Sequence, residues 1–266
     1  MPESAWFAHA AADPALPSSR RILGVRVDDV TEDEAVAICA RFVGAGEGRR
    51  IVATPNPEIV MAALDDRALR HALAQADLAL PDGGGLLLAA RLWGRPLREQ
   101  VRGSDLTNRL LERAAAHGWR VFLLGGGQGV AEDAAARIAA RWPGVRLVGT
   151  MAGLADEAHD ATTRGAVAGA GRVDLLLVGY GASRQERWMV RNVPLLDVGV
   201  ALGIGGTLDF LAGRVRRAPR WVRQAHLEWL FRLLIQPWRW RRQLRAARFF
   251  PLILLRASRE RRRHRR

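Results

Sequence analysis

Four segments combine polar residues or glycines with a position directly after a short aliphatic run. Carboxylate, amide and guanidinium groups at such positions can bind a sugar or a phosphate, and they can move a proton. Glycines there let a ligand approach the backbone closely. These segments are therefore the first places to look for chemistry. In chain order they cover residues 54–57 (TPNP), 81–85 (PDGGG), 125–129 (GGGQG) and 179–186 (GYGASRQE).

The most reactive candidate is Asp82, which follows Pro81 and precedes three glycines. A carboxylate at this place could act as a general base that takes a proton from an attacking hydroxyl group. Turn or helix-cap chemistry stays open and is favoured by the residues alone, because Asp-Gly is a common turn pair. Asn56, followed by Pro57, fits a helix N-cap better than a ligand contact.

Two further segments could contact phosphate or sugar groups. Gly125 and Gly126 open a loop whose backbone N–H groups can face a phosphate, although a tight turn explains these glycines equally well. Arg184, Gln185 and Glu186 offer a cation, an amide and a carboxylate together. These three residues fit the solvated first turn of a helix equally well. The histidines and the single cysteine show no metal-ligand spacing, so we expect no metal site.

Short aliphatic runs that alternate with amphipathic segments must position these residues. Such alternation predicts βαβ crossovers and a Rossmann-like α/β fold, with a largely parallel sheet covered by helices on both faces. Ligands of such sheets bind beyond the carboxyl ends of the strands, so the four segments should converge on one cleft. The predicted strands cover residues 51–54, 78–80, 121–124, 145–148, 173–178 and 198–202, and the predicted helices include 57–76, 104–117, 130–141 and 156–170.

Charge divides the chain into three predicted parts. Residues 214–266 hold 18 arginines against two acidic residues, whereas the rest of the chain is near neutral. Tryptophan and leucine are interleaved with these arginines, which favours helices that lie in an anionic membrane interface. We therefore predict a mobile leader (1–20), an α/β core (21–213) and a basic helical membrane-docking appendage (214–266).

The expected cellular compartment is inferred from three kinds of sequence feature: a secretory signal, membrane-spanning segments and cysteines. The sequence shows no secretory signal at residues 1–20, and its longest apolar runs fall far short of the roughly 20 residues that span a bilayer. One cysteine cannot form an internal disulfide, which favours a reducing compartment. We expect a cytoplasmic protein that is peripheral on the inner face of a bacterial membrane. The oligomeric state stays open.

Taken together, the motifs resemble the WecG/TagA/CpsF glycosyltransferase family, and the similarity runs from about residue 22 to residue 245. Many short matches occur in order along the chain. They are 54–58 (TPNPE), 81–83 (PDG), 103–106 (GSDL), 121–126 (VFLLGG), 185–186 (QE), 203–209 (GIGGTLD), 212–213 (AG), 217–219 (RAP) and 227–232 (LEWLFR).

The resemblance implies an inverting transferase that needs neither a metal nor another cofactor. Its donor would be a UDP-sugar of N-acetylmannosamine, its uronic acid or a related sugar. Its acceptor would be a saccharide linked to undecaprenyl diphosphate. The family's proposed base matches Asp82, and Thr54, Asn56 and Gln185 match its polar active-site residues. The basic C-terminal region would dock on the membrane and close over the site.

Guanidinium groups would then stabilise the departing diphosphate, and several arginines are candidates. Gln100 stands where the family usually has an arginine, so Arg98 or Arg102 is expected to take over that contact. The appendage offers Arg217, Arg220 and Arg223 for the same task.

The arginine-rich tail, taken by itself, fits a second class of function equally well. An arginine-rich tail also suits a non-catalytic nucleotide- or RNA-binding protein. That hypothesis gives no reason for Asp82 and the Gln185-Glu186 pair to stand at strand ends. The tryptophans and leucines of the tail suit lipid better than a nucleic acid. We therefore expect no nucleic-acid partner.

Overall fold

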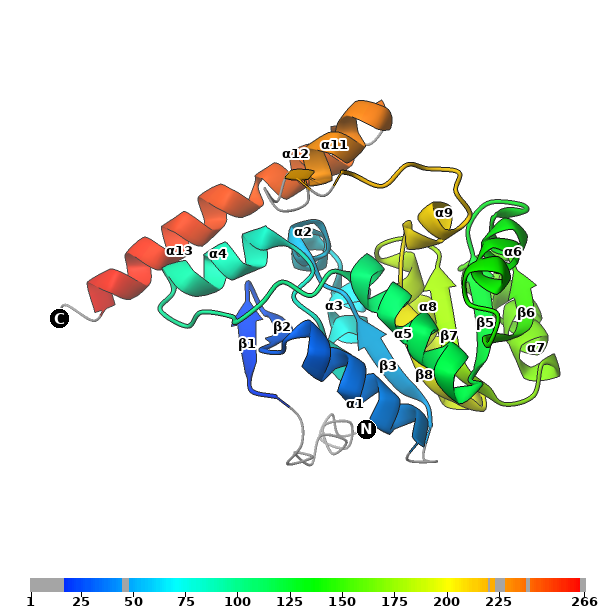
Figure 1. The fold of residues 1–266 in the computed structure, drawn as a ribbon. Coiled ribbons are helices and arrows are strands. Elements are labelled where there is room, and N and C mark those ends of the chain that lie inside the picture. The colour runs from blue at the N-terminus through cyan, green and yellow to red at the C-terminus, as the bar shows by residue number, and fades with distance from the viewer. Residues whose placement is uncertain (1–16, 45–47, 220, 223–227, 238–239, 264–266) are drawn as a thin grey trace.

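The computed structural model describes residues 17–44, 48–219, 221–222, 228–237 and 240–263, and its ribbon is shown in Figure 1. Its centre is a six-stranded sheet in the order β4-β3-β8-β7-β5-β6, in which every neighbouring pair is parallel. The predicted α/β architecture is confirmed. The strands are β3 (Arg50–Ala53), β4 (Leu78–Ala79), β5 (Arg120–Gly125), β6 (Arg146–Met151), β7 (Val173–Gly179) and β8 (Val198–Gly203).

Helices cover both faces of this sheet, because successive residues of each strand point to opposite sides. In β5, Val121 and Leu123 join one apolar core, while Phe122 and Leu124 join the other. The first core is covered by α1 (Glu32–Gly44), α5 (Gly103–His117), α6 (Val130–Arg141) and α9 (Thr207–Leu211). The second is covered by α2 (Pro57–Asp65), α3 (Arg67–Ala74), α4 (Gly84–Leu92), α7 (Asp160–Gly169) and α8 (Arg184–Asn192).

One predicted helix is split by an aspartate, and another begins with a 3₁₀ turn that an aspartate caps. Asp66 has an extended backbone, and its Oδ1 atom accepts a 3.0 Å hydrogen bond from the Leu69 N–H, so the predicted helix over 57–76 splits into α2 and α3. Asp156 caps a 3₁₀ turn, η2 (Glu157–His159), that precedes α7. A second 3₁₀ turn, η3 (Val193–Leu195), follows α8.

The N-terminal region corrects one predicted boundary. The described chain enters a hairpin of β1 (Ser19–Ile22) and β2 (Val25–Asp28), so the last two residues of the predicted leader 1–20 belong to a strand. Leu23 and Gly24 both have positive φ, as a tight hairpin turn with the right twist requires. The rest of the leader up to residue 16 lies outside the described residues.

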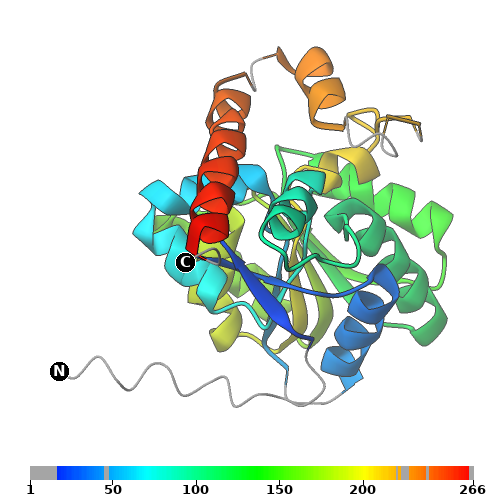
Figure 2. The same cartoon turned by 90° about the vertical axis from the view of Figure 1, so that its left-hand side faces the viewer.

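Where it is described, the basic C-terminal region holds an irregular segment, 214–219, and three longer helices, α11 (Glu228–Ile235), α12 (Trp240–Ala247) and α13 (Phe249–Arg263). Phe249 and Ile253 of α13 are fully buried in the same core as α2 and α4. The indole Nε1 of Trp93 also donates a 3.1 Å hydrogen bond to the Ile253 carbonyl. In Figures 1 and 2, α13 lies along the body, whereas α11 stands above it. The region predicted as an appendage is thus anchored at its far end.

Among the described residues, no helix combines the length and the apolar character that crossing a bilayer requires.

Candidate functional site

The carboxyl ends of β3, β4 and β8 meet at one edge of the sheet, and predicted site residues follow β3 and β4. The Thr54 hydroxyl, after β3, donates a 3.0 Å hydrogen bond to the carbonyl of Gly203 at the end of β8. The backbone N–H of Asp82, after β4, donates a 3.0 Å hydrogen bond to the Pro55 carbonyl. The segments after β3 and β4 are therefore tied directly together.

The side chain of Asp82 reaches the first residue of α5. The Gly103 N–H donates a 3.2 Å hydrogen bond to Oδ2 of Asp82. A methyl group on Gly103 would lie 3.2 Å from Cγ2 of Thr54 and 3.3 Å from Oδ2 of Asp82, so these three residues are in close contact. The positive end of the helix dipole favours a negative charge at this position. Asp82 is thus a carboxylate at a helix N-terminus, with polar neighbours from two strand ends.

Asn56 lies beside this group but has a structural task. Its Oδ1 atom accepts a 3.0 Å hydrogen bond from the Ile59 N–H and caps α2, which has Pro57 at its start. The capping expectation is confirmed. A Cβ atom on Gly83 would come within 3.6 Å of the Asn56 Cβ, so the cap of α2 adjoins the turn after Asp82.

Gln185 and Glu186 point into the protein instead of toward solvent. Both side chains are 2% exposed. The Oε1 atom of Gln185 accepts a 2.9 Å hydrogen bond from the Gly205 N–H, and its Nε2 atom donates a 3.0 Å hydrogen bond to Oε1 of Glu186. Burial is the main cause that raises the pKa of Glu186. The pair therefore holds the turn after β8, and the last residue of this strand, Gly203, accepts the hydrogen bond from Thr54.

Gly125 and Gly126 form a tight turn between β5 and α6. Both have positive φ, and the Gly126 N–H donates a 3.2 Å hydrogen bond to the Gly179 carbonyl at the end of β7. A Cβ atom on Gly125 would lie 2.7 Å from the carbonyl carbon of Gly179, so only glycine fits there. Arg214 covers the end of this loop and donates a 3.2 Å hydrogen bond to the Gln128 carbonyl.

Arg102 and Arg217 meet at the N-terminus of α5, next to the contact between Gly103 and Asp82. Nη2 of Arg217 donates hydrogen bonds to Oγ of Ser104 at 2.6 Å and to Oδ1 of Asp105 at 2.7 Å. Nε of Arg102 lies 3.8 Å from Oε2 of Glu228, at the start of α11. Arg217, six residues after α9, and Glu228, the first residue of α11, thus both contact residues at the start of α5. The other two predicted appendage contacts, Arg220 and Arg223, lie outside the described residues.

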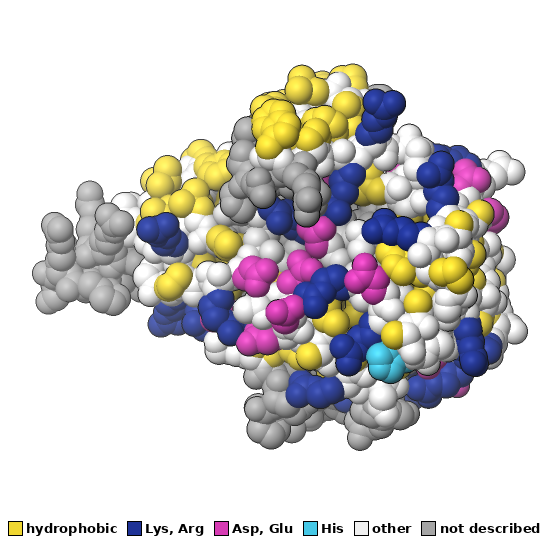
Figure 3. All heavy atoms as spheres, in the orientation of Figure 1, with side chains coloured by type: hydrophobic (Ala, Val, Ile, Leu, Met, Phe, Trp, Pro, Cys, Tyr) yellow, Lys and Arg dark blue, Asp and Glu magenta, His cyan; other side chains and the backbone are white. Residues whose placement is uncertain are grey.

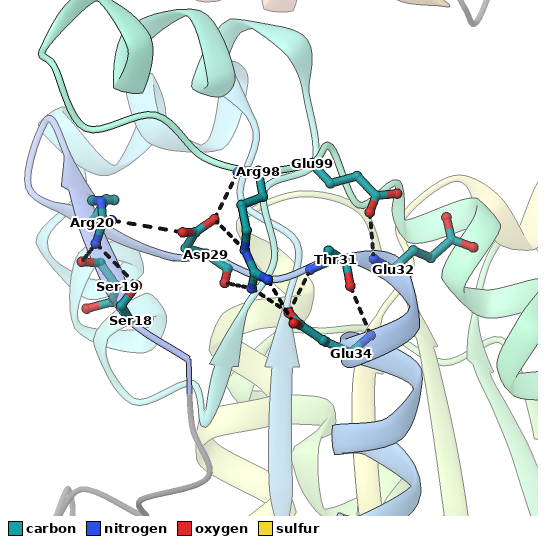
Figure 4. A network of polar contacts seen from close by, with 9 residues as sticks. All are labelled: Ser18, Ser19, Arg20, Asp29, Thr31, Glu32, Glu34, Arg98 and Glu99. Carbon is teal, nitrogen blue, oxygen red and sulfur yellow. Dashed lines mark hydrogen bonds and ion pairs between the residues drawn. The ribbon is translucent and has the colours of Figure 1, made fainter.

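Arg98 belongs to a separate network at the N-terminus of α1 (Figure 4). Its guanidinium donates hydrogen bonds of 2.8 and 2.5 Å to the two carboxylate oxygens of Glu34, and its backbone N–H donates one of 2.9 Å to Asp29. Neighbouring Glu99 accepts a 3.3 Å hydrogen bond from the Glu32 N–H. The structure therefore uses Arg98 to hold the loop before α5 onto the start of α1.

Arg184 also lies apart from the group around Asp82. It lines a surface hollow of about 610 Å³ between α3, the segment 154–157 and α8. Asp82 is not among the described residues that line this hollow. Arg184 is the first residue of α8, and its side chain is not on the buried helix face that holds Gln185 and Glu186.

Three residues at the start of α5 carry more of the site than their sequence suggests. Gly103, Ser104 and Asp105 contact Asp82 or Arg217, although the sequence singles them out only through the family resemblance. A stronger signal for a binding site is that these residues open an amphipathic helix, because the first backbone N–H groups of a helix have no partner within it. Within the described ranges, no group of three or more His, Cys, Asp or Glu side chains is placed to hold a metal ion.

Known proteins are similar to this chain over most of its length. A model of the Glycosyl transferase WecG/TagA/CpsF family matches residues 20–264. Proteins named N-acetylglucosaminyldiphosphoundecaprenol N-acetyl-beta-D-mannosaminyltransferase are similar in three species. The protein of Bacillus spizizenii is 33% identical over 80% of this chain and 81% of its own. That of Bacillus subtilis is 31% identical over 77% and 78%, and that of Staphylococcus aureus is 30% identical over 83% and 85%.

The matched region covers the whole sheet, the Asp82 cluster and the C-terminal helices through α13. The relatives align over three quarters or more of both chains. The chain therefore belongs to the WecG/TagA/CpsF family of glycosyltransferases.

Proposed function

We propose that this glycosyltransferase moves N-acetylmannosamine, its uronic acid or a related sugar from a UDP donor to a saccharide on undecaprenyl diphosphate. Two findings support the proposal. The similar proteins of Bacillus and Staphylococcus are named as mannosaminyltransferases that act on N-acetylglucosaminyldiphosphoundecaprenol. The strand-end cluster of this chain also places a carboxylate, Asp82, beside two arginines at one helix N-terminus.

The position of Asp82 is the observation that carries the mechanism. Its carboxylate takes the proton of an acceptor hydroxyl group as that oxygen attacks the anomeric carbon of the donor sugar. The bond between this carbon and the UDP oxygen breaks at the same time, and UDP departs with the electron pair. Attack from the face opposite UDP inverts the configuration, so an α-linked donor gives a β-linked product.

Guanidinium groups take the charge of the departing diphosphate in this proposal, and no metal is needed. Arg102 and Arg217 already lie at the N-terminus of α5, next to the residue that binds Asp82. Arginine suits the task because its planar fork matches two phosphate oxygens. In the structure Arg102 pairs with Glu228, and Arg217 pairs with Asp105. The phosphates of the donor would compete with these carboxylates for the two arginines.

The C-terminal helices would bring the enzyme to its lipid-linked acceptor. Figure 3 shows hydrophobic side chains gathered over α11 at the top of the view. Large apolar side chains are exposed on all three helices, and they suit a lipid interface better than a nucleic acid. They are Trp229, Leu230, Leu234 and Ile235 on α11, Trp240 and Leu244 on α12, and Phe250, Leu254 and Leu255 on α13.

The decisive experiment measures transfer from a panel of UDP-sugars to a lipid-diphosphate-linked N-acetylglucosamine. The native chain is compared with Asp82→Asn, and Asp65→Asn on the exposed end of α2 serves as the matched control. Asp82→Asn should bind UDP normally but lose about 10³-fold in turnover, within the usual range for a general base. Near-normal turnover of this variant would exclude Asp82 as the base.

Membrane docking needs its own measurement. Sedimentation with vesicles that contain anionic lipids should retain the native chain, and the bound fraction should fall as salt rises, because arginine–headgroup attraction is screened. Exchange of Trp229 and Leu234 for serine should weaken the binding at every salt concentration. Binding that persists unchanged in this variant would rule out α11 as the docking surface.

A further inference from the structure

The buried pair Gln185 and Glu186 is unusual for residues at a presumed ligand edge. They lie in the first turn of α8, the helix that follows β7, yet their side chains share the inward face of this helix with Trp188 and Met189. A side chain that is 2% exposed cannot reach a substrate unless the surrounding structure opens. The first question is therefore what these two side chains hold in place.

They hold the turn that follows β8. Oε1 of Gln185 accepts the 2.9 Å hydrogen bond from the Gly205 N–H. The amide also packs against Gly203, where a Cβ atom would lie only 2.7 Å from Nε2 of Gln185. Nε2 in turn donates to Oε1 of Glu186 at 3.0 Å, which fixes the orientation of the amide. Without an acceptor at residue 186, the amide of Gln185 would lose one of the two hydrogen bonds that fix its orientation.

The same turn is held from the opposite side by Thr54. Its hydroxyl donates a 3.0 Å hydrogen bond to the Gly203 carbonyl. Thr54 also contacts Gly103, whose N–H binds the Asp82 carboxylate. A continuous series of contacts therefore runs from Glu186 through Gln185 and the 203–205 turn to Thr54, and from there to Asp82.

The surroundings of Glu186 favour the neutral carboxylic acid. Burial raises the pKa of this group, and the field of Glu58 on α2 adds to the effect. The Gln185 amide and nearby backbone amides act in the opposite direction, but their combined effect is smaller. Oε2 of Glu186 has no hydrogen-bond partner among the described residues, an arrangement that would be far costlier for an ion than for a neutral acid.

We propose that Glu186 is a positioning residue that orients Gln185, so that Gln185 and Thr54 together clamp the 203–205 turn beside Asp82. This inference deepens the proposed function, on which its kinetic test rests. It assigns neither Gln185 nor Glu186 a direct contact with the sugar or the diphosphate. Their contribution to the rate comes from holding the edge of the site in one geometry, since a displacement of about 1 Å can cost on the order of 100-fold in rate.

Substitutions at residue 186 test whether Glu186 acts by positioning Gln185 or by carrying a negative charge. Glu186→Gln keeps the size of the side chain and an acceptor oxygen for Gln185, so kcat should stay within about threefold of the native value. Glu186→Ala removes the acceptor, and kcat should fall by roughly 10- to 100-fold while KM for the donor changes little. A loss of activity in Glu186→Gln as severe as that in Glu186→Ala would overturn the proposal.

A reversal of the hydrogen bond gives a stricter test. Gln185→Glu removes the donor and sets two carboxyl groups against each other, so kcat should fall sharply. The double variant Gln185→Glu/Glu186→Gln restores a hydrogen bond with its donor and acceptor exchanged, while an oxygen at residue 185 can still accept from the Gly205 N–H. The double variant should recover at least about tenfold over Gln185→Glu. A double variant no better than the single one would show that the pair does not act through this hydrogen bond.

Hydrogen exchange of the backbone amides in residues 203–207 tests the clamp without any assay of activity. Exchange should be slow in the native chain and in Glu186→Gln, and at least about tenfold faster in Glu186→Ala. This readout stands even if no UDP-sugar is transferred, an outcome that would reject the proposed function alone. Unchanged exchange in a folded Glu186→Ala variant would reject the clamp alone.

Discussion

The backbone N–H of Gly103 donates a 3.2 Å hydrogen bond to the Oδ2 atom of Asp82, so the start of α5 and the end of β4 share one carboxylate. This contact orients the side chain that the proposed mechanism uses as its base. It also leaves little space, because Thr54 lies against the same glycine. The absence of a side chain at residue 103 is therefore a requirement of the site and not of the helix.

We predict that Gly103→Ala impairs transfer without impairing stability. The new methyl group would meet Cγ2 of Thr54 at 3.2 Å and Oδ2 of Asp82 at 3.3 Å, and the flexible carboxylate is the group that can move. Turnover should fall by about tenfold or more. The midpoint of thermal unfolding should be unchanged or slightly higher, because alanine favours helix over glycine by up to about 1 kcal/mol.

Gly165→Ala on α7 is the matched control for this substitution, because a Cβ atom there meets nothing within 4 Å. Kinetic assays and thermal unfolding of both variants check the prediction. Equal turnover in the two variants would show that the space around Asp82 does not control the reaction.

A second prediction concerns the segment that crosses from α9 toward α11. Arg217 binds Asp105 with side chains that are 22% and 23% exposed, whereas the Arg214–Asp133 pair is 43% and 50% exposed. Solvent screens the first pair less, and its guanidinium also binds Ser104. A double-mutant cycle on Arg217 and Asp105 should give a coupling free energy near 1 kcal/mol, and the cycle on Arg214 and Asp133 about half of that or less.

Urea unfolding of the single and double variants measures both coupling energies. The cycles need Arg217→Met with Asp105→Asn, and Arg214→Met with Asp133→Asn, so that size is kept as the charges are removed. A larger coupling for the exposed pair than for the Arg217 pair would contradict the expectation that the less exposed ion pair is the stronger one.

The sheet could be predicted from the sequence because each buried parallel strand is a short aliphatic run between glycines and polar residues. All six predicted runs became strands, and α6 has the predicted bounds. The split between α2 and α3 was missed, since the apolar period continues across the break and only the capping role of Asp66 marks it. The β1–β2 hairpin was missed, because its two strands of four residues each carry only a short apolar pattern interrupted by arginines.

The edge of the sheet that holds the candidate site could also be predicted, because the ends of parallel strands must meet. The directions in which the long side chains point could not be predicted from the sequence. Arg98 turns toward Glu34, a partner 64 residues away, and Arg184 lines a hollow beside α3. Gln185 and Glu186 were expected to face a ligand, yet their spacing from Trp188 and Met189 places all four on one buried helix face.

The network around Arg98 should make stability depend on pH. Hydrogen bonds from the Arg98 guanidinium are the main cause that lowers the pKa of Glu34. A carboxyl group whose pKa is lower in the folded state stabilises the fold above its unfolded pKa, and the contribution is lost as the pH falls through the folded value. The free energy of unfolding should therefore be higher for the native chain than for Glu34→Gln at neutral pH, and the difference should shrink as the pH falls below about 4.

Urea unfolding between pH 3 and 7 checks this dependence, with Glu112→Gln on the exposed side of α5 as control. The effect should be small, because the side chains of Arg98 and Glu34 are 48% and 44% exposed. A difference that grows as the pH falls would have the wrong sign for an ion pair.

The last prediction concerns the carboxylate that opposes Arg102. Glu228 is one of only two acidic residues in the strongly basic stretch 214–266, and its Oε2 atom lies 3.8 Å from Nε of Arg102. If the donor diphosphate binds Arg102, it must compete with this carboxylate. Glu228→Gln should then tighten UDP binding, by about fivefold at most, because a partly exposed ion pair contributes about 1 kcal/mol or less.

Titration calorimetry with UDP at low and high salt measures this effect, and the gain should shrink at high salt because the competition is electrostatic. Glu260→Gln removes the other acid of the same stretch and controls for the change in net charge. Equal tightening in both variants would assign the gain to net charge alone. Weaker binding in Glu228→Gln would mean that Glu228 orients Arg102 toward the diphosphate instead of competing with it.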